Sequence, residues 1–164
     1  MFGHSVSLFR IFGFEIRVDI TWAFLAILIA VSLARGFFPA TYEGWPTVTY
    51  WWMAAVGIIG VFLSIVLHEL AHSVAARFMG LQMKGITLFL FGGVAEMGDE
   101  PKTAKTELVM AIAGPIMSLV LAGLLFATAN VLRPEDGVTP LVAVIDYLGW
   151  LNMIVAFFNM VPAF

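Results

Sequence analysis

Four long apolar stretches dominate the chain, and short polar segments separate them. They cover approximately residues 20–35, 50–78, 107–132 and 138–164. The first is short for a membrane span, because about 20 residues are needed to cross the hydrocarbon core as a helix. Residues 36–46 contain two prolines and two glycines, which favours a loop. The pattern therefore predicts a membrane all-α core of about four transmembrane helices.

Two segments with a different pattern predict short β-hairpins at one face of this core. Residues 6–18 alternate loosely around a Phe-Gly-Phe break, with an interfacial segment as the alternative to a hairpin. Residues 84–98 form two β-prone runs around a tight turn at Gly92 and Gly93. If successive spans cross the membrane in alternating directions, the N-terminus and the 79–105 connection lie on the same side. Together with Arg77 at the end of the second span, that side then holds six of the eight Lys and Arg residues, so we expect it to be cytoplasmic.

The composition agrees with a membrane protein. Hydrophobic residues make up 62% of the chain and charged residues 12%, whereas a typical soluble domain is about 25% charged. The net charge is -3 and no basic run is present, which argues against a nucleic-acid partner. Cysteine is absent, which excludes disulfides and thiolate metal sites. We expect residues 1–164 to form a single membrane-embedded domain with the bilayer as a partner. A homo-oligomer remains open.

The second span ends in the motif His-Glu-Leu-Ala-His. His68 and His72 are four residues apart, so a helix places both imidazoles on one face, where they can bind one Zn²⁺. Glu69 is turned by about 100° from His68 and can act as general base on a zinc-bound water. Ionisable residues are costly inside a membrane helix and usually mark function there, so a chance occurrence is the weaker interpretation.

The position of the motif within the span predicts the kind of substrate. Arg77 is expected to mark the cytoplasmic interface, and it lies about 13 Å along the helix from His68. The zinc would then lie roughly 10 Å inside the bilayer. A protease with its zinc at this depth would cut membrane segments.

A catalytic zinc usually has a third protein ligand, which the motif does not supply. His4 is remote in sequence and favours a surface position, and the last span offers only Asp146, Asn152 and Asn159. None of these is spaced as a ligand pair with the motif. For Asp146, a water-facing position at the interface is favoured over zinc ligation.

Three further motifs make the chain resemble the site-2 protease family. They are Phe-Gly-Gly-Val-Ala at 91–95, Ala-Gly-Pro at 113–115, and an Asn-x-x-Pro run that begins at Asn159. The layout is similar to that of prokaryotic members without an inserted periplasmic domain. In that family an Asp eight residues after this Asn is the third zinc ligand. Here that position would fall three residues beyond Phe164, so the sequence looks truncated before it.

The resemblance implies an intramembrane zinc metalloendopeptidase. Such an enzyme cleaves transmembrane segments of regulatory membrane proteins, anti-sigma factors among them, in regulated intramembrane proteolysis. The resemblance implies Glu69 as the catalytic residue and His68 and His72 as the zinc ligands. It also implies that Asn159 holds substrate near the zinc, with a helix-packing amide as the alternative.

The strand that precedes Gly92 suggests how substrate is held. A substrate helix has to unwind before its backbone can reach the zinc, and an exposed strand edge at residues 86–91 would pair with the unwound segment. We therefore expect substrate contacts at Leu88, Phe89, Gly92 and Gly93. A hairpin that only closes the cytoplasmic mouth is the alternative.

The sequence leaves two alternative functions open. A membrane zinc protease of the prenyl-protein type would take a downstream Glu as third ligand, but the later glutamates all lie near predicted loops: Glu96, Glu100, Glu107 and Glu135. A transporter or metal-binding scaffold explains the spans but not a Glu beside paired histidines. Replacing Glu69 with Gln separates the alternatives, because a protease keeps zinc and loses cleavage.

Overall fold

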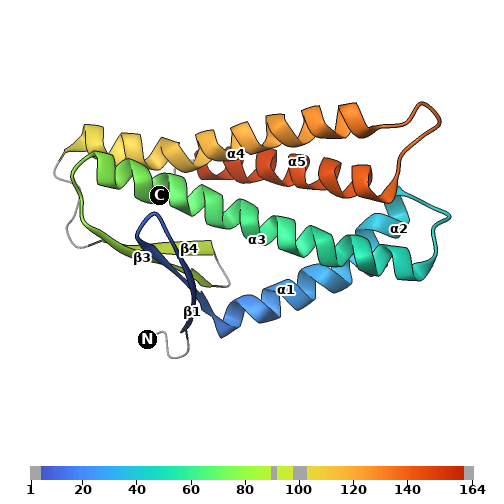
Figure 1. Cartoon of the computed structure of the whole chain (residues 1–164), viewed down its shortest axis with the longest axis horizontal. Coiled ribbons are helices and arrows are strands. Elements are labelled where there is room, and N and C mark those ends of the chain that lie inside the picture. The colour runs from blue at the N-terminus through green and yellow to red at the C-terminus, as the bar shows by residue number, and fades with distance from the viewer. Residues whose placement is uncertain (1–4, 90–91, 98–102, 161–164) are drawn as a thin grey trace.

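The computed structural model describes residues 5–89, 92–97 and 103–160. Long helices lie side by side in a bundle, and a small sheet packs beside α3 near one end (Figure 1). In chain order the elements are β1 (Ser5–Ile11), β2 (Phe14–Asp19), α1 (Ile20–Ser32), η1 (Leu33–Phe37), α2 (Phe38–Thr41), α3 (Thr47–Phe78), β3 (Met83–Phe89), β4 (Gly92–Met97), α4 (Ala104–Leu132) and α5 (Pro140–Met160).

Four helical segments are long and apolar enough to cross a membrane, which confirms the prediction from the hydrophobic pattern. They are Ile20–Thr41, Thr47–Phe78, Ala104–Leu132 and Pro140–Met160. α4 begins before residue 107 because Thr103 caps it, its Oγ1 accepting a hydrogen bond from the amide of Thr106 at 3.2 Å. Residues 161–164, the end of the fourth predicted span, lie outside the described residues.

The predicted loop at residues 36–46 is wrong in its first half. The first helix continues through a π-helical turn, η1, and one further α-helical turn, α2, to Thr41. At this turn the amide of Phe38 donates to the carbonyl of Leu33, five residues back. Pro39 then falls in the first turn of α2, where its missing N–H is tolerated. The first span is therefore 22 residues long, enough to cross a bilayer.

Both predicted hairpins are present, and they join into one four-stranded sheet in the order β1-β2-β3-β4. The two hairpins are antiparallel, whereas β2 and β3 pair in parallel, with Ile16 opposite Ile86. β3 is therefore an inner strand, paired on both sides. The prediction of an exposed edge at residues 86–91 is therefore wrong for residues 86–88, and residues 90–91 lie outside the described part of the chain. Among the described strands, the outer edges belong to β1 and β4.

The two glycines of the second hairpin belong to a strand and not to its turn. Gly92 pairs with Phe89 and Gly93 pairs with Leu88, so both glycines open β4. Residues 90–91, between the two strands, lie outside the described part of the chain. The prediction that Gly92 and Gly93 form the turn is therefore wrong.

α3 buries one face against the sheet. Its residues Val66 and Leu70 form an apolar core with four fully buried side chains of β2 and β3, namely Phe14, Ile16, Ile86 and Leu88. Two alternate residues of each strand supply this core, as expected for strands with one buried face. At the end of α3, Nη1 of Arg77 donates to the carbonyl of Phe12 at 2.6 Å. The sheet and the C-terminal end of α3 are thus held together.

α5 packs closely on α3 through a small residue and an amide. A Cβ at Gly60 of α3 would collide with Leu148 of α5. Asn152 of α5 is 1% exposed, and its Nδ2 donates to Oγ of Ser64 on α3 at 2.9 Å. Small residues and interhelical hydrogen bonds are the usual means of holding membrane helices together. Asn152 is therefore a helix-packing amide and not a metal ligand.

Candidate metal centre

The two histidines of α3 lie together on the face that turns away from the sheet. Nε2 of His68 and Nε2 of His72 are 3.1 Å apart, and His68 is only 4% exposed. Val66 and Leu70, each two positions from a histidine, pack on the sheet. Because two residues correspond to about 200° of helix rotation, the histidines point to the opposite side.

α4 holds each histidine through its other ring nitrogen. Nδ1 of His68 lies 2.8 Å from Oγ of Ser118, and Nδ1 of His72 lies 2.6 Å from the carbonyl oxygen of Met110. Met110, Gly114 and Ser118 follow one another at intervals of four residues, so they share one face of α4. Successive turns of this α4 face therefore lie against the two histidines of α3.

The contact to Met110 leaves Nε2 of His72 free to bind a metal. A carbonyl oxygen can only accept a hydrogen bond, so Nδ1 of His72 carries the hydrogen, and a neutral ring then has a bare Nε2. Metal-binding histidines commonly donate their second N–H in this way. Two nitrogens at about 2.0–2.1 Å from one tetrahedral zinc lie about 3.3 Å apart, close to the 3.1 Å separation here. The pair therefore fits a zinc ion.

Gly114 leaves open the space next to both Nε2 atoms. A Cβ at this position would lie 2.6 Å from Nε2 of His68 and closer still to Nε2 of His72. Any side chain would thus put a carbon atom at nearly metal–ligand distance from both nitrogens. Glycine is the only residue that lets α4 approach the histidines so closely and still leaves room for an ion.

Glu69 is half-buried on α3, one position after His68. The helix turns its side chain by about 100° from that of His68, to the flank of the histidine face. Within the part of the chain that the structure describes, no group of three His, Cys, Asp or Glu side chains is placed to hold a metal. His68 and His72 are therefore two ligands of the candidate site, and His4 lies outside the described residues.

Two other candidates from the last span are not joined to the histidines by any described contact. Asp146 lies near the start of α5, at the opposite end of the bundle from the C-terminal end of α3 (Figure 1). Its Oδ2 accepts a hydrogen bond from Nη2 of Arg133 at 2.6 Å, and its side chain is 18% exposed. Asp146 is thus an ion-pair partner and not a substitute zinc ligand. Asn159 is exposed, and its Nδ2 donates to the carbonyl of Val155 at 2.8 Å.

The candidate substrate residues of the second hairpin lie on the sheet beside α3. Leu88 is fully buried in the core between sheet and helix, whereas Phe89 is half-buried. Gly92 and Gly93 lie in β4, which pairs with β3 on one side. Substrate binding by these four residues and by Asn159 stays a prediction.

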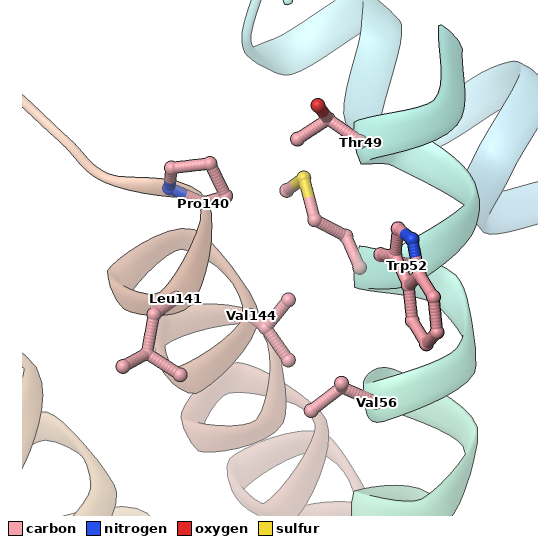
Figure 2. A pocket seen from close by; sticks show the side chains of 7 residues that line it. Thr49, Trp52, Val56, Pro140, Leu141 and Val144 are labelled. Carbon is pink, nitrogen blue, oxygen red and sulfur yellow. The ribbon is translucent and has the colours of Figure 1, made fainter. Parts of the chain in front are cut away.

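A hollow of about 190 Å³ lies at the other end of the bundle, between the first turns of α3 and α5 (Figure 2). Its lining is almost wholly apolar and consists of Thr49, Trp52, Met53, Val56, Pro140, Leu141 and Val144. The nearest of these residues on α3 precedes His68 by twelve positions, about 18 Å along the helix. The hollow carries no ionisable group and is separate from the candidate metal site.

The sequence did not predict which face of α4 contacts the two histidines. Gly114 belongs to the Ala-Gly-Pro motif, yet nothing in the motif alone says which side chains it meets. Ser118 is a polar residue in an uncharged run, four positions after Gly114. The four-residue recurrence of a small and a polar residue is a signal that could have found this face.

Comparisons with known proteins point to one family. The model of peptidase family M50 matches residues 56–135. A Mycobacterium tuberculosis protein named as a zinc metalloprotease, Rip3, is 38% identical over 160 residues, which cover 96% of this chain and 40% of that protein. A zinc metalloprotease from Methanocaldococcus jannaschii is 33% identical over 162 residues, covering 98% of this chain and 42% of that protein.

A solved structure agrees with these relatives. The site-2 protease from Methanocaldococcus jannaschii superimposes with a TM-score of 0.66 at 30% sequence identity, covering 98% of this chain and 66% of that one. The chain spans about two fifths of the length of the curated relatives it matches.

Proposed function

Because the chain belongs to peptidase family M50, the site-2 protease family, we propose that it forms the metal-binding core of an intramembrane zinc endopeptidase. The observation that carries the proposal is the pair of Nε2 atoms 3.1 Å apart on an apolar helix, with Nδ1 of both rings held by α4. A helix-packing role for the histidines would not require two Nε2 atoms to converge beside a glycine. A zinc site does require it.

The chain's own residues have distinct tasks in this reaction. His68 and His72 hold the zinc, which when bound acidifies a water molecule and polarises the scissile carbonyl. The Glu69 carboxylate takes a proton from the attacking water and returns it to the departing amide nitrogen. Met110 and Ser118 hold the two imidazole rings in the orientation that metal binding requires.

The substrate of such a site is a transmembrane segment of another protein, of the class of regulatory membrane proteins. The histidines lie in the last third of an apolar 32-residue helix, so a peptide bond that reaches them comes from within or close to the bilayer. The sheet and the C-terminal end of α3 face the cytoplasm of a prokaryotic cell in this proposal, because six of the eight basic residues fall in the N-terminal segment and in residues 77–105 of the sequence.

The edge of β4 is the strand edge that would take an unwound substrate. β4 pairs with β3 on one side, and β3 packs on α3 through Ile86 and Leu88. On its other side no described strand pairs with β4. An extended substrate added here would gain main-chain hydrogen bonds at Gly92, Gly93 and the residues after them, next to the helix that carries the zinc ligands.

Removal of zinc tests the proposed activity. The full-length protein is reconstituted in proteoliposomes with a single-span reporter whose span contains helix-breaking residues near its cytoplasmic end. We expect a zinc chelator to lower cleavage at least about a hundredfold, because the metal supplies several kcal/mol of transition-state stabilisation. Added Zn²⁺ should restore cleavage and Mg²⁺ should not. Full cleavage by a preparation that elemental analysis finds free of metal would contradict the proposal.

Proline substitutions test the edge of β4. Alternate residues of an edge strand turn their amides outward. Val94 and Ala95 are neighbours, so one of the substitutions Val94→Pro and Ala95→Pro removes an outward amide donor, and the other removes an amide that faces β3. We expect the outward substitution to lower kcat/KM about 3- to 10-fold, since a hydrogen bond contributes about 0.5–1.5 kcal/mol. Zinc content and thermal stability should not change for that variant.

The opposite edge of the same sheet supplies the control. Val6→Pro places the same residue in β1, which among the described strands pairs with β2 alone, and cleavage should stay at the wild-type rate. Equal losses of cleavage at both edges would mean that the sheet is only a structural support for α3.

A further inference from the structure

Ser118 lies in the middle of α4 and is completely buried. Its Oγ is 2.8 Å from Nδ1 of His68, on the side of the ring away from the candidate metal position. We propose that Ser118 is a positioning residue that fixes the tautomer and the ring orientation of His68, and thereby sets the zinc affinity of the site. The proposal rests on the proposed zinc protease function and adds a residue to its machinery.

The two histidines are held by partners of different chemical kind. His72 faces the carbonyl of Met110, which only accepts, so its hydrogen stays on Nδ1. His68 faces a hydroxyl group, which can either accept a hydrogen bond or donate one. Only when the hydroxyl accepts does His68 carry its hydrogen on Nδ1 and leave Nε2 bare. The hydroxyl at position 118 thus decides whether His68 presents a bare Nε2 to a metal.

Burial makes this contact hard to replace. His68 is 4% exposed and Ser118 is fully buried, so no bulk water is available to hydrogen-bond Nδ1 if the hydroxyl is removed. The imidazole would then favour any arrangement that pairs its N–H elsewhere, including the tautomer with hydrogen on Nε2. Nε2 of His72 lies 3.1 Å away and would accept that hydrogen bond. A proton held there occupies the lone pair that zinc needs.

A serine in a membrane helix can also be only a small packing residue, and the structure distinguishes the two roles. A packing residue needs small size, whereas a positioning residue needs its hydroxyl at a defined place. Ser118 lies on the same α4 face as Gly114 and Met110, which both meet the histidines. Its Oγ is aimed at a ring nitrogen on another helix, 50 residues away in the chain.

The experiment compares Ser118→Ala with Ser118→Thr in the full-length protein, using Zn²⁺ and Co²⁺ as probes. Alanine keeps the small size and removes the hydroxyl, and threonine keeps the hydroxyl. We expect Ser118→Ala to weaken zinc binding about 10- to 100-fold in competition with a chelator, the usual effect of losing such a partner. Threonine should restore affinity to within a few-fold. The visible absorption of bound Co²⁺ should shift in the alanine variant, because the ligand ring is reoriented.

Ser73→Ala is the matched control. Ser73 follows His72, is also fully buried, and its Oγ has no hydrogen-bond partner among the described residues. Its replacement should leave zinc affinity and the Co²⁺ spectrum unchanged. If Ser118→Ala does not fold, Ser118→Cys replaces it in the same measurement. A thiol is a weak hydrogen-bond acceptor, so zinc binding should again be weakened.

Two outcomes separate this inference from the proposed function. Wild-type zinc affinity and an unchanged Co²⁺ spectrum in Ser118→Ala would overturn the role of Ser118, while zinc-dependent cleavage by the wild-type protein would still stand. Absence of zinc binding by the wild-type protein itself would instead overturn the proposed protease function.

Discussion

Replacement of Glu69 by Gln is expected to lower the cleavage rate about 10²- to 10⁴-fold, the usual contribution of a general base, and to leave zinc bound. The carboxamide has the shape of the carboxylate but cannot take a proton from water. Glu69 is half-buried on α3, so a residue of equal size preserves its surroundings. His68 and His72 keep their contacts to α4, and zinc affinity should therefore change little.

The measurement combines single-turnover cleavage in proteoliposomes with zinc content per protein. Glu107→Gln is a suitable control, because Glu107 lies exposed in the first turn of α4, and cleavage should stay at the wild-type rate. Loss of zinc from Glu69→Gln would mean that this carboxylate binds the metal itself or that it is needed for the structure of α3 around the histidines. Cleavage above about a tenth of the wild-type rate would exclude Glu69 as the general base, although the protein would still be a protease.

The features that sequence predicts well here are those that local chain geometry determines. Apolar runs gave the four helices long enough to cross a membrane, because the hydrocarbon thickness sets their length. The spacing of His68 and His72 predicts their adjacency on α3, since four residues make about one helical turn. Both hairpins likewise follow from alternation over short segments.

The features that sequence did not predict depend on contacts between distant segments. β2 and β3 pair in parallel across more than sixty residues of chain, which turned the expected edge strand into an inner strand. The helix up to Thr41 survives Pro39 only through a π turn, which no composition rule signals. The pairing of Asp146 with Arg133 likewise required the two ends of the α4–α5 connection to be placed together.

Gly114→Ala is the substitution expected to affect the metal site most. The added methyl group would lie within 3 Å of both Nε2 atoms, a distance that a Cβ atom does not adopt. Either the carbon occupies the space of the ion, or α4 moves away and the contacts of Met110 and Ser118 to the two rings are lost. Such overpacking costs about 1–3 kcal/mol of stability. Both responses abolish the site, so zinc should be undetectable and cleavage should fall to background.

The same helix contains a glycine that makes the test specific. Gly123 is exposed and a Cβ there would meet nothing within 4 Å, so Gly123→Ala should keep zinc and activity and gain up to about 1 kcal/mol of helix stability. Metal analysis and thermal unfolding of the two variants then distinguish loss of the ion from loss of the fold. A Gly114→Ala protein that binds zinc with wild-type affinity would mean that the ion lies on another side of the histidines. The face of α4 would then be a helix contact only, and the inference for Ser118 would fail with it.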